Sequence, residues 1–165
     1  MSQFLLPEEI IDLARRVVEE NRAIGRKIAL AESCTGGLVA AALTEIAGSS
    51  AVLDRSFVTY SNEAKKEMLG VAGDVIDAFG AVSIACVYAM AQGALQHSEA
   101  DVAVAISGIA GPEGGSEQKP VGTVVFARAV RYAEEREAES KVFEASDRSE
   151  VRRQATLCAL ELLLP

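Results

Sequence analysis

The chain has 165 residues, half of them hydrophobic, and a formal net charge of −8. This length suits one domain, expected over residues 1–165, and the charge argues against a nucleic-acid partner because phosphate contacts dominate that affinity. No apolar run approaches the roughly 20 residues that a membrane-spanning helix needs, so no membrane partner is expected. The three cysteines are widely spaced and match neither a metal motif nor a disulfide framework, which favours a reducing cytoplasm and no metal site. No cofactor is expected.

The first part of the chain has the pattern of an α/β unit. An amphipathic helix begins near Pro7, and a short buried strand is followed by a tight glycine turn and a second helix. Next come a segment rich in β-branched and aromatic residues and a short helix that Ser61 or Asn62 caps. The elements expected here are a helix over residues 6–25, a strand over 27–32, a helix over 36–48, a strand over 51–60 and a helix over 61–70.

The second part adds a central strand and an antiparallel pair. A continuous apolar run favours a central strand, and only a short turn separates the last two strands, so these two should pair antiparallel. The elements expected are helices over residues 74–80 and 83–98, strands over 101–107, 121–130 and 136–145, and a helix over 147–164. The chain therefore predicts an α/β fold with a mixed sheet of about five strands, one of them antiparallel, and helices on both faces.

Three polar loops follow strands of this sheet. They are "SCTGG" at residues 33–37, "YSNEAK" at 60–65 and "SGIAGPEGG" at 107–115. In open α/β sheets, ligands bind beyond the carboxyl ends of the strands, so these loops are expected to converge on one site.

The "SCTGG" turn has two interpretations. Thr35 or Ser33 could simply cap the following helix, with Gly36 and Gly37 permitting a tight turn. Alternatively, Ser33 is a nucleophile, and free amides of the turn stabilise a developing oxyanion. In the second case Thr35, Gly36 and Gly37 contact the substrate.

A serine nucleophile needs a base, and the sequence offers a lysine rather than a histidine. His97, the one histidine, precedes the third strand and belongs at the opposite edge of the sheet. Lys65 shares a helical stripe with apolar residues, among them Met68 and Leu69, and burial would lower its pKa as a lysine base requires. The alternative is a lysine that snorkels to solvent. Tyr60 has three interpretations. It packs in the core, it hydrogen-bonds Ser33 or Lys65, or it stacks on a ring of the ligand.

The glycine-rich loop matches neither the phosphate-binding P-loop nor the dinucleotide fingerprint. It is either a mobile surface loop or a wall of the site that offers amides and a hydroxyl to a ligand. In the second case the candidate substrate-binding residues are Ser107, Gly108, Ile109, Ala110 and Gly111.

The motifs "AESCTGG", "VTYSNEAKKEMLGV", "GAVS", "AISGIAGPEGG" and "KPVGTV", in this order and spacing, resemble the CinA C-terminal domain family. That family includes the stand-alone nicotinamide mononucleotide amidohydrolases known as PncC. The resemblance implies a three-layer α/β/α fold and hydrolysis of nicotinamide mononucleotide to nicotinate mononucleotide and ammonia. It also implies catalysis by a serine–lysine pair without a metal. Carried over by motif, the catalytic residues are Ser33, Lys65 and Tyr60. A small-molecule nucleotide substrate and a homo-oligomer are expected.

Two alternatives stay open at this point. The domain could bind a nucleotide, or a partner in a competence- or damage-associated role, without catalysis. Alternatively, the amidase chemistry could use Cys34, which is adjacent to Ser33, as the nucleophile.

Overall fold

One mixed sheet forms the centre of the protein in the computed structural model, which describes residues 3–134 and 136–165. The strands are β1 (Ile28–Glu32), β2 (Leu53–Val58), β3 (Val102–Gly108), β4 (Thr123–Val130) and β5 (Arg136–Val142). Their order across the sheet is β2-β1-β3-β4-β5. β1 is parallel to β2 and β3, whereas β4 is antiparallel to β3 and β5. The expected five-stranded sheet with one antiparallel strand is confirmed.

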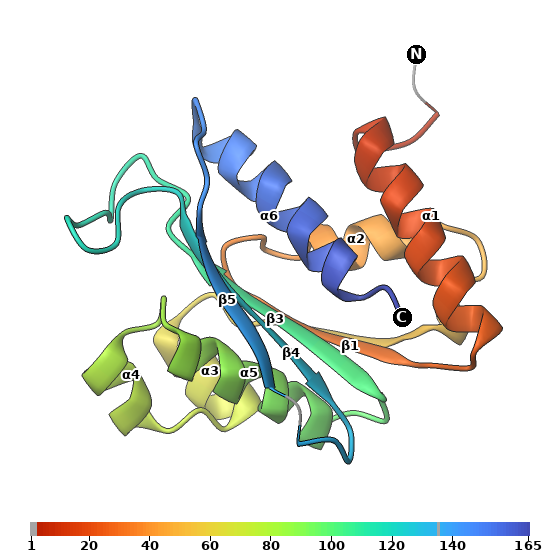
Figure 1. The fold of residues 1–165 in the computed structure, drawn as a ribbon, viewed down its shortest axis with the longest axis horizontal. Helices are drawn as coiled ribbons and strands as arrows, with labels where there is room; N and C mark the ends of the chain where they lie inside the picture. Colours follow the sequence, from red (N-terminus) through yellow and green to blue (C-terminus); the bar gives the residue numbers. More distant parts are fainter. Residues whose placement is uncertain (1–2, 135) are drawn as a thin grey trace.

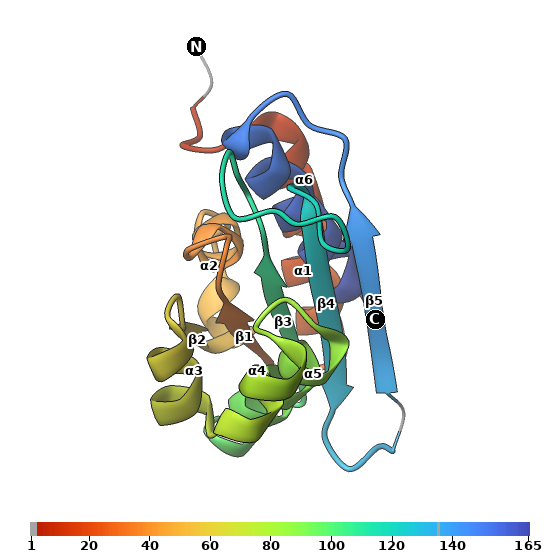
Figure 2. The same ribbon diagram turned by 90° about the vertical axis from the view of Figure 1, so that its left-hand side faces the viewer.

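Helices cover both faces of this sheet, as Figures 1 and 2 show. They are α1 (Glu8–Ala23), α2 (Leu38–Thr44), α3 (Asn62–Leu69), α4 (Gly73–Phe79), α5 (Ile84–Gln96) and α6 (Arg148–Leu162), with a short 3₁₀ turn at Ser49–Ala51. α1, α2 and α6 enclose one apolar core with the sheet, and α3, α4 and α5 enclose the other. The three-layer α/β/α arrangement is therefore confirmed. Within the described ranges, none of these helices is long and apolar enough to cross a membrane.

Residue size on β3 decides how closely each helical layer approaches the sheet. Val102, Val104 and Ile106 belong to the core beneath α1, α2 and α6, whereas Ala103 and Ala105 belong to the core beneath α5. Alternate side chains of a strand point to opposite faces, so the small alanines let α5 lie close to the sheet. α3 in turn rests on α5 at Gly93, where a Cβ atom would overlap the Leu69 carbonyl.

The chain leaves the sheet earlier than expected after β2. The strand ends at Val58, two residues before the expected end at Tyr60. The Thr59 amide still donates to the Glu32 carbonyl at 2.9 Å, but Tyr60 is 61% exposed. Because the chain turns away here to start α3, the carbonyls of Thr59 and Tyr60 are released from sheet pairing. They are then free to meet the side chain of Lys65.

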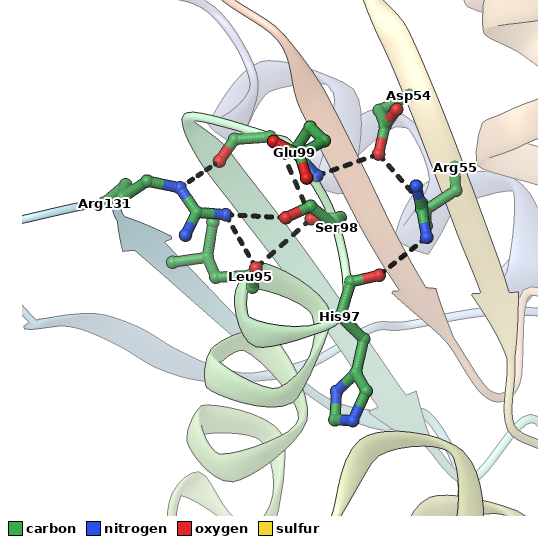
Figure 3. A network of polar contacts seen from close by, with 8 residues as sticks. Asp54, Arg55, Leu95, His97, Ser98, Glu99 and Arg131 are labelled. Atoms are coloured by element: carbon green, nitrogen blue, oxygen red, sulfur yellow. Dashed lines mark hydrogen bonds and ion pairs between the residues drawn. The ribbon is translucent and has the colours of Figure 1, made fainter.

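A polar network ties together the edge of the sheet where the parallel strands begin (Figure 3). The guanidinium of Arg131, just beyond β4, donates to three backbone carbonyls at 2.6–3.0 Å. These are the carbonyls of Leu95, Ser98 and Ala100. His97 lies in this network, exposed at the end of α5, and its carbonyl accepts from Arg55 at 2.9 Å. The expectation that His97 lies at the edge opposite the polar loops is confirmed.

Candidate active site

The three polar loops meet at the carboxyl edge of β1, β2 and β3. They enclose a pocket of about 170 Å³ with help from the segment before α5 and the first turn of α6. The pocket is lined by Ser33, Cys34, Tyr60, Asn62, Lys65, Ala81, Val82, Ser107, Gly108, Ala110 and Arg148. The expected convergence of the loops is confirmed, and it brings Ser33 and Lys65 into one pocket.

The side chains of Ser33 and Lys65 are in direct contact. The Nζ atom of Lys65 lies 3.1 Å from the Oγ atom of Ser33, although 32 residues separate them in the chain. Lys65 is only 1% exposed and Ser33 is 7% exposed. Lys65 and Leu69 share the buried stripe of α3, whereas Met68, which was expected on it, is 41% exposed. The snorkelling alternative for Lys65 is therefore wrong.

The surroundings of Lys65 favour a neutral amine. Burial lowers the pKa of Lys65 below its ordinary value of 10.5. No carboxylate pairs with this amine among the described residues. Its two other partners are the carbonyls of Thr59 at 2.9 Å and Tyr60 at 3.3 Å. A neutral amine has two N–H donors and one lone pair. If the two carbonyls accept the N–H groups, the lone pair is left facing the hydroxyl of Ser33, as a general base requires.

Cys34 has a different environment from its neighbour. It is 4% exposed and packs in the core beneath α1, α2 and α6. Burial raises the pKa of the Cys34 thiol to about 11, and the nearby carboxylate of Glu32 adds to this effect. A thiol with such a pKa is almost entirely protonated at neutral pH and is a poor nucleophile. The surroundings of the two side chains thus favour Ser33 over Cys34.

Glu32 holds the turn that carries Ser33. Its carboxylate is fully buried, accepts the amides of Val39 at 3.0 Å and Ala40 at 3.1 Å, and accepts the hydroxyl of Thr35 at 2.7 Å. The Thr35 side chain is thus directed at Glu32, so a contact between Thr35 and a substrate could use only its backbone. The role of Glu32 was not foreseen, although a carboxylate at the end of a buried apolar strand was a signal for it.

The two glycines of the turn adopt backbone angles that other residues avoid. The φ angles are 57° at Gly36 and 103° at Gly37, which leads directly into α2. The Gly36 amide donates to the Ser33 carbonyl at 3.0 Å and closes the turn. Side chains at these positions would strain the backbone, so the glycines keep the nucleophile turn tight.

The loop after β3 supplies one wall of the pocket. Ser107 is 2% exposed, and Gly108 has no room for a Cβ between Val124 and the Sγ of Cys34. Ala110 also lines the pocket. The Ile109 amide is already used, because it donates to the Thr123 carbonyl at 2.8 Å. Of this expected binding set, Ser107, Gly108 and Ala110 therefore reach the pocket, and Ile109 does not line it.

Tyr60 and Arg148 form the rim. The Tyr60 hydroxyl accepts from Arg148 Nη2 at 2.9 Å, and Arg148 Nη1 donates to the Gly111 carbonyl at 2.7 Å. Arg148 thus joins the β2–α3 segment to the glycine-rich loop from the start of α6. Gly111 contributes to the site through this carbonyl and does not line the pocket. The side chain of Tyr60 is 61% exposed, which excludes the interpretation that Tyr60 packs in the core.

Comparison with known proteins agrees with this arrangement. The model of the CinA C-terminal domain matches residues 10–165. The chain belongs to the CinA C-terminal domain family. The Escherichia coli K12 protein named nicotinamide-nucleotide amidohydrolase PncC is 52% identical over 158 residues, which cover 94% of this chain and 93% of that protein. A CinA-like protein of Mycobacterium sp. (strain JLS) is 54% identical over 139 residues, but these cover only 32% of its length.

A solved structure has the same fold as this CinA domain. The competence/damage inducible protein CihA from Agrobacterium tumefaciens superposes with a TM-score of 0.93 at 49% identity, covering 99% of this chain and 97% of that one. The relatives thus carry two kinds of name, one enzymatic and one taken from induction by competence or damage.

Three pocket residues of this CinA domain have no chemical signal in the sequence. Asn62 enters from the start of α3, and Ala81 and Val82 enter from the "GAVS" motif. These three residues form part of the pocket wall only because the fold brings them into the same pocket as Lys65. Within the described part of the chain, no group of three or more His, Cys, Asp or Glu side chains is arranged to hold a metal ion.

Proposed function

We propose that this protein hydrolyses the carboxamide of nicotinamide mononucleotide to nicotinate mononucleotide and ammonia, with Ser33 as nucleophile and Lys65 as base. The proposal rests on the contact of 3.1 Å between a serine hydroxyl in the pocket and a buried lysine amine that pairs with no carboxylate among the described residues. A lysine held this way costs stability, which favours a catalytic use over a structural one. The substrate comes from the name of the Escherichia coli relative, which aligns with nearly the whole chain.

The first half of the reaction forms an acyl-enzyme. The neutral amine of Lys65 takes the proton of Ser33, and Oγ attacks the carboxamide carbon to give a tetrahedral oxyanion. Lys65 then delivers this proton to the departing nitrogen, the C–N bond breaks, and ammonia leaves. The nicotinoyl group stays on Ser33 as an ester.

The second half restores the enzyme. Lys65, neutral again, takes a proton from water as the water oxygen attacks the ester carbon. The proton returns to Ser33 Oγ as the ester bond breaks, and nicotinate mononucleotide leaves. One amide and one water are thus converted to one carboxylic acid and one ammonia. A base of this kind contributes about 10²–10⁴-fold in rate.

The remaining pocket residues are assigned as substrate contacts within the same proposal. Ser107, Gly108 and Ala110 are assigned to the ring and ribose, and the backbone amide of Thr35 is assigned to the reacting carbonyl. Arg148 and Tyr60 at the rim offer a positive charge and a phenol to the phosphate end. A local cation lets a protein of net charge −8 bind an anionic nucleotide.

Ammonia release from nicotinamide mononucleotide by the purified protein tests the proposal, with Ser33→Ala as the inactive control. Product formation by the wild type and none by the variant is the expected result. Nucleotide binding by both proteins with no ammonia from either would instead favour the non-catalytic alternative.

The organisation of the protein is part of the proposal. We propose a single domain over residues 1–165 that functions as a homo-oligomer in the cytoplasm. Cys34, Cys86 and Cys158 are all buried and unpaired, as in proteins of reducing compartments. Light scattering of the purified protein measures the oligomeric state directly.

A further inference from the structure

Arg152 holds the nucleophile turn without lining the pocket. It comes from α6, and its Nε donates to the Cys34 carbonyl at 3.0 Å while Nη2 lies 3.4 Å from the Thr35 carbonyl. Arg152 does not line the active pocket. It lines a separate hollow of about 280 Å³ with Leu38 and the segment that leads into α1. Ser33 and Cys34 of the turn line the active pocket, whereas Arg152 contacts the turn at the Cys34 and Thr35 carbonyls.

Peptide geometry determines where the N–H groups of the turn point. In a trans peptide unit the C=O and the following N–H point in opposite directions. Since the Cys34 and Thr35 carbonyls face Arg152, the N–H groups of Thr35 and Gly36 face away from it. The Gly36 N–H follows this rule and donates to the Ser33 carbonyl at 3.0 Å.

The Thr35 N–H has no such partner. Thr35 is fully buried, yet its amide donates to no residue in the described part of the chain. A buried N–H without an acceptor costs about 1–3 kcal/mol, and folds rarely retain one. The peptide unit could relax by rotating, but rotation would break the charge-assisted bond between Arg152 and the Cys34 carbonyl.

We propose that Arg152 is a positioning residue that keeps the Cys34–Thr35 peptide oriented so that the Thr35 N–H binds the oxyanion formed when Ser33 attacks. The inference rests on the proposed amidase function. Arg152 itself touches neither the substrate nor Ser33 Oγ. It acts through the Cys34–Thr35 peptide, whereas Glu32 holds the same turn through the Thr35 hydroxyl.

The neighbouring arginine provides a matched control. Arg153 is on the same helix, but its guanidinium pairs with Glu150 and Glu9 and makes no contact with the turn. Arg152→Met and Arg153→Met remove the same charge one residue apart. Any effect of net charge is common to both variants, and Arg153→Met additionally removes the ion pairs with Glu150 and Glu9.

Steady-state kinetics with nicotinamide mononucleotide separates the roles. We expect Arg152→Met to lower kcat about 10–100-fold, the cost of a misplaced catalytic group, while KM stays within about threefold. Arg153→Met should keep the wild-type kcat. Arg152→Lys, which retains one donor for the Cys34 carbonyl, should fall between wild type and Arg152→Met.

A transition-state probe gives a readout that a merely structural residue would not change. Pyridine-3-boronic acid forms a tetrahedral adduct with a nucleophilic serine, and one of its oxygens takes the oxyanion position. Its affinity should fall in Arg152→Met by the same factor as kcat, whereas the affinity for nicotinate mononucleotide should not change. Crystal structures should show the Cys34–Thr35 peptide rotated in Arg152→Met only.

Three results would overturn the proposal: full kcat in Arg152→Met, a loss confined to KM, or an equal loss in Arg153→Met. An unrotated peptide in the crystal structure of Arg152→Met would also overturn it. Failure of the proposed function gives a different pattern, because the wild type itself would then release no ammonia.

Discussion

The two edges of the sheet use their polar groups in opposite ways. At the edge where the parallel strands begin, Arg131 donates to three backbone carbonyls, and Asp54 accepts from both Arg55 and the Glu99 amide (Figure 3). At the carboxyl edge, Lys65 is buried and pairs with no carboxylate in the described part of the chain, and the Thr35 N–H likewise donates to no described residue. The groups of this network are satisfied within the protein, whereas the carboxyl edge leaves some of its polar groups for a ligand.

This difference separates stability from chemistry. Satisfied polar groups hold the connections between strands and helices, and their loss should reduce the free energy of unfolding. Groups left open at the carboxyl edge contribute little to folding or oppose it, but they suit a reaction that develops charge. Substitutions at the carboxyl edge should therefore lower turnover and leave stability largely unchanged. Substitutions at the edge where the parallel strands begin should lower stability and leave turnover unchanged.

The largest effect is expected at the Ser33–Lys65 pair. Ser33→Ala and Lys65→Met should each lower kcat by about 10³-fold or more, and the double variant should be little worse, because the pair acts as one unit. Circular dichroism should show that the fold survives in all three variants. If Ser33→Ala retained the turnover of the wild type and Cys34→Ala were inactive, the thiol of Cys34 would be the nucleophile.

The pH dependence should report the neutral amine of Lys65. Because burial lowers its pKa, kcat/KM should rise about tenfold per pH unit and level off below the ordinary lysine value of 10.5. The unfolded chain binds this proton more tightly than the folded one, so wild-type stability should increase with pH between the folded pKa and 10.5. Lys65→Met should lack this increase. A rate limb with its midpoint at or above 10.5 would contradict a lowered pKa.

At the opposite edge, Arg131→Met should affect stability instead. Three carbonyls lose their charged donor, which should cost about 2–3 kcal/mol in urea unfolding, while kcat stays at the wild-type value. Arg16→Met removes an exposed pair with Glu20 on α1 and should cost less than about 0.5 kcal/mol. Equal losses in both variants would mean that the network of Figure 3 is not special.

Cys34→Ala tests the boundary between the two behaviours within one turn. Cys34 packs in the core, so the change should cost about 1–2 kcal/mol of stability through the cavity that it leaves. Most of the turnover should remain, and an alkylating reagent should inhibit the wild type only slowly. Rapid inactivation by the reagent would indicate that the Cys34 thiol is reactive, which would contradict its buried position.

The smallest effect is expected from metal removal. The mechanism uses the described residues alone, so dialysis against a chelator should leave kcat unchanged. Loss of turnover that zinc restores would refute a metal-free mechanism.

Local patterns in the sequence were sufficient to predict the fold and the proximity of Ser33 and Lys65. Hydrophobic periodicity and turn residues predicted the helices and strands, because each element depends on its own repeat of apolar positions. The rule that ligands bind beyond strand carboxyl ends then brought residues 33 and 65 to one edge. The end of β2 was misplaced by two residues, because the aromatic residue Tyr60 has the pattern of a strand residue although the strand pairing ends at Val58.

Only the tertiary structure decided what surrounds the Ser33–Lys65 pair. Burial of Lys65 follows from the packing of α3 on α5 at Gly93, and the contacts of Arg148 and Arg152 come from a helix more than 80 residues away in the chain. The sequence determined which residues could react, since that property belongs to their side chains. Their partners, exposure and pKa values depend on distances between segments remote in the chain, which local patterns do not encode.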